Sequence, residues 1–183
     1  MRGIFFRIYG VIYTLCLKYF YKNIKIKGKI VSSGFFSVEI SKSATLDIVG
    51  TIVLRSNVLI AARNGAKLII KDGCFFNRDV SIVCRESIEI GKNSIFGEGV
   101  KIYDNNHKVI NGKISNNKFD TEKIIIGSYC WIGNGVNILK GSIIQNKTII
   151  GAMSLVKGRL SRAGIYVGVP VKFLSPLKTI QYD

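Results

Sequence analysis

His107 is the only histidine in the chain, and it lies in a polar stretch, Asn105-Asn106-His107-Lys108. A neutral imidazole is well suited to remove a proton near neutral pH, because its pKa lies close to that pH. A lone histidine is more commonly a solvated surface residue, but this one stands at the mouth of the only long interruption in a periodic sequence. Loops on a rigid scaffold frequently carry catalytic groups. His107 is therefore the candidate general base.

Other catalytic arrangements find little support. The chain has no Gly-x-Ser-x-Gly elbow, which disfavours a serine acyl-enzyme. A hydratase metal centre with histidine ligands needs more than one histidine, and the cysteines have no metal-like spacing. These cysteines are Cys16, Cys74, Cys84 and Cys130. The absence of cysteine pairs and of a convincing cleavage site after the first segment predicts a reducing, cytoplasmic setting without a metal.

A six-residue repeat predicts the scaffold that positions His107. Aliphatic residues recur at Ile126, Ile132, Ile138, Ile144, Ile150 and Val156. Smaller or branched residues stand two positions before most of them, at Cys130, Val136, Ser142, Thr148 and Ser154. A hexapeptide period indicates a parallel β-helix, with both sets pointing into a narrow interior. The phase is the same at Ile102, so residues 104–123 are predicted to be a loop that leaves a continuous solenoid.

The repeat extends toward the N-terminus in weaker form. Isoleucines alternate with lysines over residues 24–30, which predicts an entry strand, and a six-residue beat follows at Ile48, Leu54 and Ile60. The phase blurs over residues 71–85, where irregular corners are expected. The predicted organisation is an N-terminal helix over residues 1–23, a β-helix over 24–160 and a C-terminal strap over 161–183.

The N-terminal segment is apolar and aromatic, and it presents one helical stripe. The stripe consists of Ile4, Ile8, Val11, Ile12, Leu15 and Tyr19. The segment is short for a bilayer span of about 20 residues and is interrupted by Arg7 and Lys18. We favour an amphipathic helix that rests on an anionic membrane through residues 1–22, helped by Arg2, Arg7, Lys18 and Lys22. The alternative is a helix packed against the solenoid or against other subunits.

Composition agrees with this picture. The chain has 183 residues, 48% of them hydrophobic, which suits one domain with a core. Its formal charge of +16 favours anionic partners. Nucleic acid is not expected among them, because the basic residues are spread along the whole chain without a binding motif.

Taken together, the motifs resemble the left-handed β-helix acyltransferases with hexapeptide repeats. The resemblance is strongest to the sugar O-acetyltransferase branch, which includes maltose and galactoside acetyltransferases and enzymes that modify capsule and lipopolysaccharide. Residues 88–93, 100–107, 126–133, 149–156 and 167–172 carry it. The ordered set of histidine loop, Trp131-Ile132-Gly133 and terminal Pro170 to Lys172 is specific. Val169 and Val171 depart from the family's usual asparagine and alanine, so the corner near the coenzyme is expected to be reshaped.

The resemblance implies a homotrimer with active sites between subunits, acetyl-CoA as co-substrate, and direct transfer to the acceptor with His107 as base. Asp104 or Asn105 would orient the imidazole, and Tyr103 and Asn77 would belong to the acceptor site. The residues expected to contact acetyl-CoA are Trp131, Gly133, Gly151, Ala152, Lys157, Arg162 and Lys172. The last three belong to a basic cluster that also fits an ordinary solvated face.

The predicted function is therefore O-acetylation of a sugar hydroxyl in a bacterial surface polysaccharide or its precursor. Two alternatives remain open. One is N-acetylation of a nucleotide-linked amino sugar, and the other is a non-catalytic solenoid scaffold at the membrane.

Overall fold

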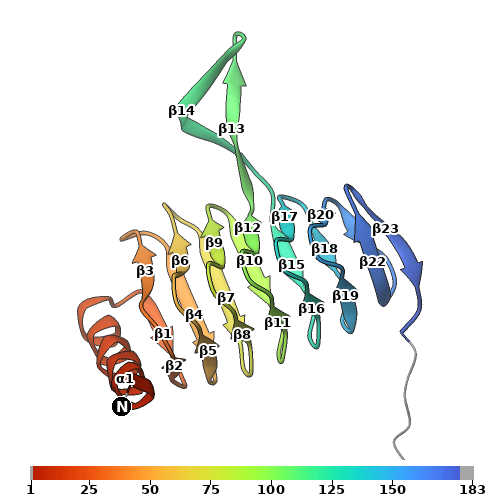
Figure 1. Ribbon diagram of the computed structural model, residues 1–183. Coiled ribbons are helices and arrows are strands. Elements are labelled where there is room, and N and C mark those ends of the chain that lie inside the picture. The colour runs from red at the N-terminus through yellow and green to blue at the C-terminus, as the bar shows by residue number, and fades with distance from the viewer. Residues whose placement is uncertain (1, 178–183) are drawn as a thin grey trace, which may run out of the picture.

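The structure is a computed structural model that describes residues 2–177, and it confirms the predicted solenoid of stacked short strands (Figure 1). Three sheets form its faces, and nearly all their strands pair in parallel with the strand one coil away. Sheet A contains β1 (Ile24–Ile26), β4 (Thr45–Val49), β7 (Lys67–Lys71), β10 (Ser87–Ile90), β15 (Ile124–Ile126), β18 (Ile143–Ile144) and β21 (Arg159–Leu160). Sheet B contains β2 (Ile30–Ser32), β5 (Ile52–Leu54), β8 (Phe75–Phe76), β11 (Ile95–Phe96), β16 (Trp131–Ile132), β19 (Thr148–Ile150), β22 (Gly164–Gly168) and β23 (Val171–Ser175). Sheet C contains β3 (Phe36–Ile40), β6 (Val58–Ala62), β9 (Ser81–Cys84), β12 (Lys101–Tyr103), β17 (Asn137–Leu139) and β20 (Leu155–Val156).

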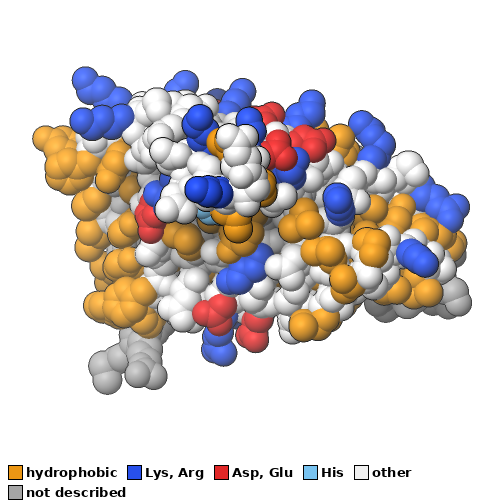
Figure 2. Space-filling model, turned by 90° about the horizontal axis from the view of Figure 1, so that it is seen from above, with side chains coloured by type: hydrophobic (Ala, Val, Ile, Leu, Met, Phe, Trp, Pro, Cys, Tyr) orange, Lys and Arg blue, Asp and Glu red, His pale blue; other side chains and the backbone are white. Residues whose placement is uncertain are grey.

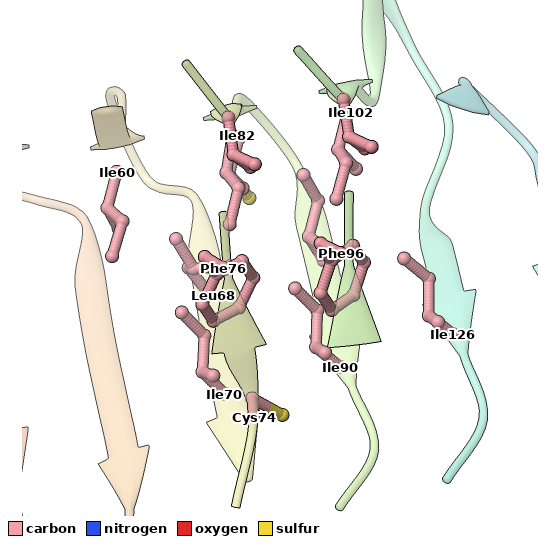
Figure 3. Packing of buried hydrophobic residues seen from close by; sticks show 14 of the residues in the cluster. Ile60, Leu68, Ile70, Cys74, Phe76, Ile82, Ile90, Phe96, Ile102 and Ile126 are labelled. Carbon is pink, nitrogen blue, oxygen red and sulfur yellow. The ribbon is translucent and has the colours of Figure 1, made fainter. Parts of the chain in front are cut away.

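The core is a set of ladders along the solenoid axis. Each strand turns alternate side chains inward, so equivalent residues of successive coils stack on one another. Figure 3 shows Ile60, Ile82 and Ile102 in one such ladder, and the rings of Phe76 and Phe96 stacked beside it. These two rings lie 4.7 Å apart between centroids and are fully buried. All six residues of the predicted beat from Ile126 to Val156 are also buried.

The coils shorten along the chain, as the residue numbers of paired strands show. In sheet A, Leu46 pairs with Leu68, Leu68 pairs with Ile88, and Ile144 pairs with Leu160, so the separation falls from each pair to the next. The additional residues of the longer coils lie at the corner between sheet C and sheet A. The irregularity expected over residues 71–85 is thus confined to the corner at 84–87, because Cys74 to Ile82 keep the regular inward pattern.

The predicted protruding loop leaves the solenoid at this same corner. It is an antiparallel hairpin of β13 (Asn105–Ile110) and β14 (Lys113–Thr121), standing far above the sheets in Figure 1. Asn111 and Gly112 form its turn with φ angles of 50° and 73°. An Asn-Gly pair favours this left-handed turn, because both residues tolerate positive φ. The base of β14 is held to the next coil by Lys140, whose ammonium lies 3.0 Å from the Asp120 carboxylate.

The N-terminal helix α1 (Arg2–Phe20) covers the first coil, as the scaffold-packed alternative requires. Gly10, Thr14 and Leu17 are buried there, and the Tyr13 ring packs on Phe36 at 4.8 Å between centroids. The predicted stripe from Ile4 to Tyr19 faces away and stays exposed. Figure 2 shows hydrophobic side chains gathered at this end of the molecule. Over the described residues, no helix has the length and apolarity needed to cross a bilayer.

At the other end, the solenoid continues past residue 160, the boundary predicted from the sequence. Strand β22 pairs in parallel with β19, and β23 then folds back antiparallel on β22. The coil therefore extends to Gly168, and the strap begins there. The last part of the predicted strap, residues 178–183, lies outside the described residues.

Candidate active site

The hairpin fixes the place of His107. His107 on β13 stands opposite Phe119 on β14, and the two rings lie 4.7 Å apart between centroids. The register shifts directly after His107, at a bulge before Val109. Bulges alter the direction of the strand and frequently occur next to functional residues. The imidazole is thus held against an aromatic ring at the base of the hairpin.

A backbone carbonyl orients the imidazole. His107 Nδ1 lies 2.8 Å from the carbonyl oxygen of Ser115. Since a carbonyl can only accept, Nδ1 must carry the hydrogen, and in the neutral ring Nε2 is then an unprotonated acceptor. The contact predicted for Asp104 or Asn105 is made by neither of them. The Asn105 amide instead donates to the Val83 carbonyl oxygen and to Asp104, at 3.3 and 3.2 Å.

Asp104 has a different task, because its side chain is fully buried and cannot meet an acceptor. Its carboxylate accepts the backbone N–H groups of Arg85, Glu86 and Ser87 at 2.8, 2.8 and 3.0 Å. It also accepts a hydrogen bond from the Cys84 thiol, at 3.4 Å. Burial and this carboxylate raise the pKa of that thiol well above its usual value. Asp104 therefore closes the corner from which the hairpin leaves.

A hollow of about 400 Å³ opens in front of His107. The predicted residues Tyr103 and Asn105 line it together with the base. Four other lining residues were not predicted from the sequence, namely Val83, Arg85, Asn106 and Phe119. Asn77 does not line it, and its side-chain oxygen accepts the backbone N–H of Arg78 at 2.9 Å. Within one chain, the structure thus brings together His107, Tyr103 and Asn105 but not Asn77.

A second hollow, of about 420 Å³, lies over sheet B and contains four of the predicted coenzyme residues. Trp131, Gly133, Gly151 and Ala152 line it, with Asn134, Ile149, Ile150 and Ile165. Trp131 is 55% exposed, so its indole is available to a ligand or another chain. A side chain at Gly133 would lie 2.6 Å from the Ala152 nitrogen, so coil stacking itself requires glycine there.

The three predicted basic contacts, Lys157, Arg162 and Lys172, are exposed and do not line this hollow. The Arg162 guanidinium stacks on the Phe173 ring at 3.3 Å from its centroid. Among residues 2–177 no three His, Cys, Asp or Glu side chains are grouped so that they could hold a metal ion. The two hollows share no lining residue.

Known proteins support the resemblance seen in the sequence. No protein-family model matches the chain. The chain is 30% identical over 116 residues to WbbJ of Escherichia coli K12, which is assigned as an O-acetyl transferase of lipopolysaccharide biosynthesis. It is 27% identical over 110 residues to the galactoside O-acetyltransferase of the same strain. The chain is thus similar in sequence to sugar O-acetyltransferases. These matches cover 58% and 60% of it but only 59% and 54% of the relatives' own length.

A solved structure has the same overall fold as this chain. A mutant of AntD, an N-acyltransferase from Bacillus cereus in complex with dTDP-4-amino-4,6-dideoxyglucose and coenzyme A, superposes with a TM-score of 0.75. The match covers 91% of the chain and 90% of AntD at 19% identity. At this identity the likeness shows a shared fold and nothing about activity.

Proposed function

We propose that the protein is an acetyl-CoA-dependent O-acetyltransferase that modifies a sugar hydroxyl of a bacterial surface polysaccharide or its precursor. The observation that carries the proposal is the 2.8 Å contact of His107 Nδ1 with the Ser115 carbonyl, which leaves Nε2 unprotonated in a side chain that lines a hollow. The relatives WbbJ and galactoside O-acetyltransferase favour a hydroxyl of a sugar as the acceptor.

In the proposed reaction, Nε2 of His107 takes the proton of the acceptor hydroxyl while its oxygen forms a bond to the thioester carbonyl carbon. The Nδ1–H to Ser115 hydrogen bond stabilises the imidazolium that results. Collapse of the tetrahedral intermediate breaks the carbon–sulfur bond, and the imidazolium returns its proton to the leaving coenzyme A sulfur. No acyl-enzyme forms, so both substrates must be bound together.

The donor would come from a second subunit. His107 is exposed in the single chain, and the hollow around Trp131 shares no residue with the hollow around His107. A general base works best where water is excluded and the reacting groups are close. We therefore propose a homotrimer in which the Trp131 hollow of one subunit presents acetyl-CoA to the His107 of its neighbour, with Lys157, Arg162 and Lys172 near the coenzyme phosphates. Asn77 would reach the acceptor only in such an assembly.

The test is acetyl-CoA thioester consumption by the full chain with a panel of sugars, nucleotide sugars and polysaccharide fragments. His107→Ala should lower acceptor-dependent turnover by about 10²- to 10⁴-fold. Lys108→Ala, its exposed neighbour on the same hairpin, is the matched control and should keep full activity. A folded wild type without turnover or coenzyme binding would support the scaffold alternative.

The N-acetyltransferase alternative is favoured by one observation, the likeness in fold to AntD. The same assay separates it when an amino sugar is included in the panel. An O-acetyl ester is released by mild alkali, whereas an N-acetyl amide is stable.

We also propose that α1 rests on an anionic membrane. Its outer face exposes Ile8, Ile12 and Leu15 by 54, 55 and 59%. Arg7, Lys18 and Lys22 are exposed near it, and the chain carries a formal charge of +16. Apolar side chains that enter the interface and cations that face anionic lipid both favour binding.

Co-sedimentation of the full chain with phosphatidylserine-containing vesicles tests this contact. The pair Ile8→Ser and Leu15→Ser should abolish binding, and vesicles of phosphatidylcholine alone should bind weakly. The matched control is Val109→Ser with Ile114→Ser, because these side chains are at least as exposed and lie on the hairpin, away from α1 (Figure 1). If the helix pair changes the oligomeric state and not vesicle binding, the face belongs to subunit contacts instead.

A further inference from the structure

The hollow in front of His107 contains a cation that the proposed reaction does not use. Arg85 follows β9 at the corner below the hairpin and lines the hollow with His107. Its guanidinium carbon lies 3.4 Å from the centroid of the Phe119 ring. The opposite strand neighbour of Phe119 is His107, whose ring packs on the same phenyl group. One aromatic side chain therefore carries both the candidate base and the arginine.

The guanidinium is held in place but has no carboxylate partner among the described side chains. The neighbouring Arg63, one coil earlier, is paired with Glu39. The nearest buried carboxylate, that of Asp104, accepts three backbone N–H groups and forms no ion pair with Arg85 within the described part of the chain. Partial burial, and then the charge of Arg63, lower the pKa of Arg85 from its ordinary value, yet an arginine stays charged at neutral pH.

Stacking on Phe119 constrains what Arg85 can bind. A guanidinium that lies over an aromatic ring keeps its N–H groups in its own plane, so they point sideways rather than into the ring. This arrangement leaves a preorganised fork that matches the two oxygens of a carboxylate or a phosphate. A neutral sugar has no group of this shape and charge.

We infer that the acceptor carries an oxyanion, a carboxylate or a phosphate, which Arg85 binds while the acceptor hydroxyl lies at His107. The inference rests on the proposed function and names its substrate class, an acidic sugar or a sugar phosphate, nucleotide-linked sugars included. Tyr103 and Asn106, which line the same hollow, complete the polar wall around the acceptor.

The energetic expectation follows from the charge. A hydrogen bond to a charged group contributes more than a neutral one, so the oxyanion should improve kcat/KM about ten- to a hundredfold over a matched neutral sugar. The gain should lie in KM, because Arg85 touches the acceptor away from the reacting oxygen. Arg85 is in this sense a specificity residue and not part of the proton transfer.

The experiment compares glucose, glucuronate and glucose 1-phosphate as acceptors of the full chain, for wild type, Arg85→Gln and Arg85→Lys. We expect Arg85→Gln to raise KM for one of the two anionic acceptors about ten- to a hundredfold and to raise KM for glucose far less. Arg85→Lys should restore part of the loss, since it keeps the charge but not the fork. Arg78→Gln, an exposed arginine of the same coil, is the control and should change nothing.

Which anion responds identifies the oxyanion as carboxylate or phosphate. The inference is wrong if the wild type has the same kcat/KM for glucose and for both anions. It is also wrong if Arg85→Gln lowers kcat/KM equally for all three acceptors. Either result would leave the proposed transferase activity standing. If no acceptor supports turnover, the proposed function fails. Equilibrium binding of glucuronate and glucose 1-phosphate to wild type and Arg85→Gln then decides the inference separately, and unchanged or absent binding would refute it.

Discussion

The second and sixth coils of the solenoid show two solutions to the same packing problem. In the second coil, which consists of β4, β5 and β6 and is one of the long ones, the first inward positions carry Leu46, Ile52 and Val58. In the sixth coil, which contains β18, β19 and β20 and is one of the short ones, the equivalent buried positions at or just before the strands carry Ser142, Thr148 and Ser154. A longer coil encloses a wider interior, which needs larger side chains to keep it filled. Coil length and side-chain volume therefore change together along the chain.

The comparison also explains where the hairpin stands. The residues that lengthen the early coils all lie at the corner between sheets C and A, and the hairpin is inserted at the equivalent corner after β12. Residues added at a corner do not alter the register of the flanking strands, and longer loops cost little additional closure entropy. This corner accepts extra chain, and the candidate site uses it.

Placing the small polar residue of the narrow coil at the equivalent position of the wide coil should give the largest loss of stability. Leu46→Ser leaves a cavity at a fully buried position and buries a hydroxyl, so we expect a loss of about 4 kcal/mol in the free energy of unfolding. The measurement is the urea midpoint at unchanged slope. Lys42→Ser, an exposed position at the corner just before this coil, is the control. A loss below about 1 kcal/mol would mean that the wide coil does not need a large side chain to fill its interior.

The corner itself can be tested at Asp104. Asp104→Ala removes the acceptor for three backbone N–H groups, and we expect about 3 kcal/mol of destabilisation. Asp104→Asn keeps one acceptor oxygen and should lose less. Hydrogen exchange at residues 85–87 should rise in both variants, and unchanged protection there would contradict the assignment.

The reverse exchange in the narrow coil should cost less. Ser154→Leu overfills a buried position and displaces the hydroxyl that accepts the Gly168 N–H at 3.1 Å, for an expected loss of about 2 kcal/mol. Ser154→Ala isolates the hydrogen bond and should lose about 1 kcal/mol. If both variants lose the same amount, the narrow coil has room to spare.

The smallest effect should be a gain. Within the described residues, Thr148 Oγ1 is the buried side-chain polar atom that lacks a hydrogen-bond partner. Thr148→Val replaces it with a methyl group of similar shape and should stabilise the fold by about 1 kcal/mol. Ser142→Ala is the opposite case, because the Ser142 hydroxyl donates to the Leu139 carbonyl at 2.6 Å. Thermal unfolding of the two variants should move in opposite directions.

The sequence predicted the solenoid well because its signal is periodic. Ile126 to Val156 recur every six residues, and each is buried as expected. The corners were less predictable, because inserted residues shift the six-residue phase but the sequence does not show at which position the insertion occurs. The Asn111-Gly112 pair could have identified the hairpin, because such a pair is a strong signal for a tight turn between two strands.

The site was predictable only in part, for a different reason. His107 stands out by type and position, but its partner is the backbone carbonyl of Ser115, which no side chain reveals. Asp104 is adjacent to the histidine loop in sequence, yet its carboxylate turns inward to the previous coil. Arg85 and Phe119 approach His107 only through the stacking of coils and the hairpin register, neither of which can be read from local spacing.

The way the rod ends has a consequence for self-association. A stack of parallel strands could in principle lengthen indefinitely by adding another molecule to its exposed edge, which is how fibres grow. Helix α1 covers the first coil, and β23 occupies the edge of β22 with the opposite strand direction. Strand β23 carries Lys172 and is flanked by Pro170 and Pro176, residues that discourage further strand pairing. In sheet B, the chain itself therefore blocks the addition of a further strand at this edge.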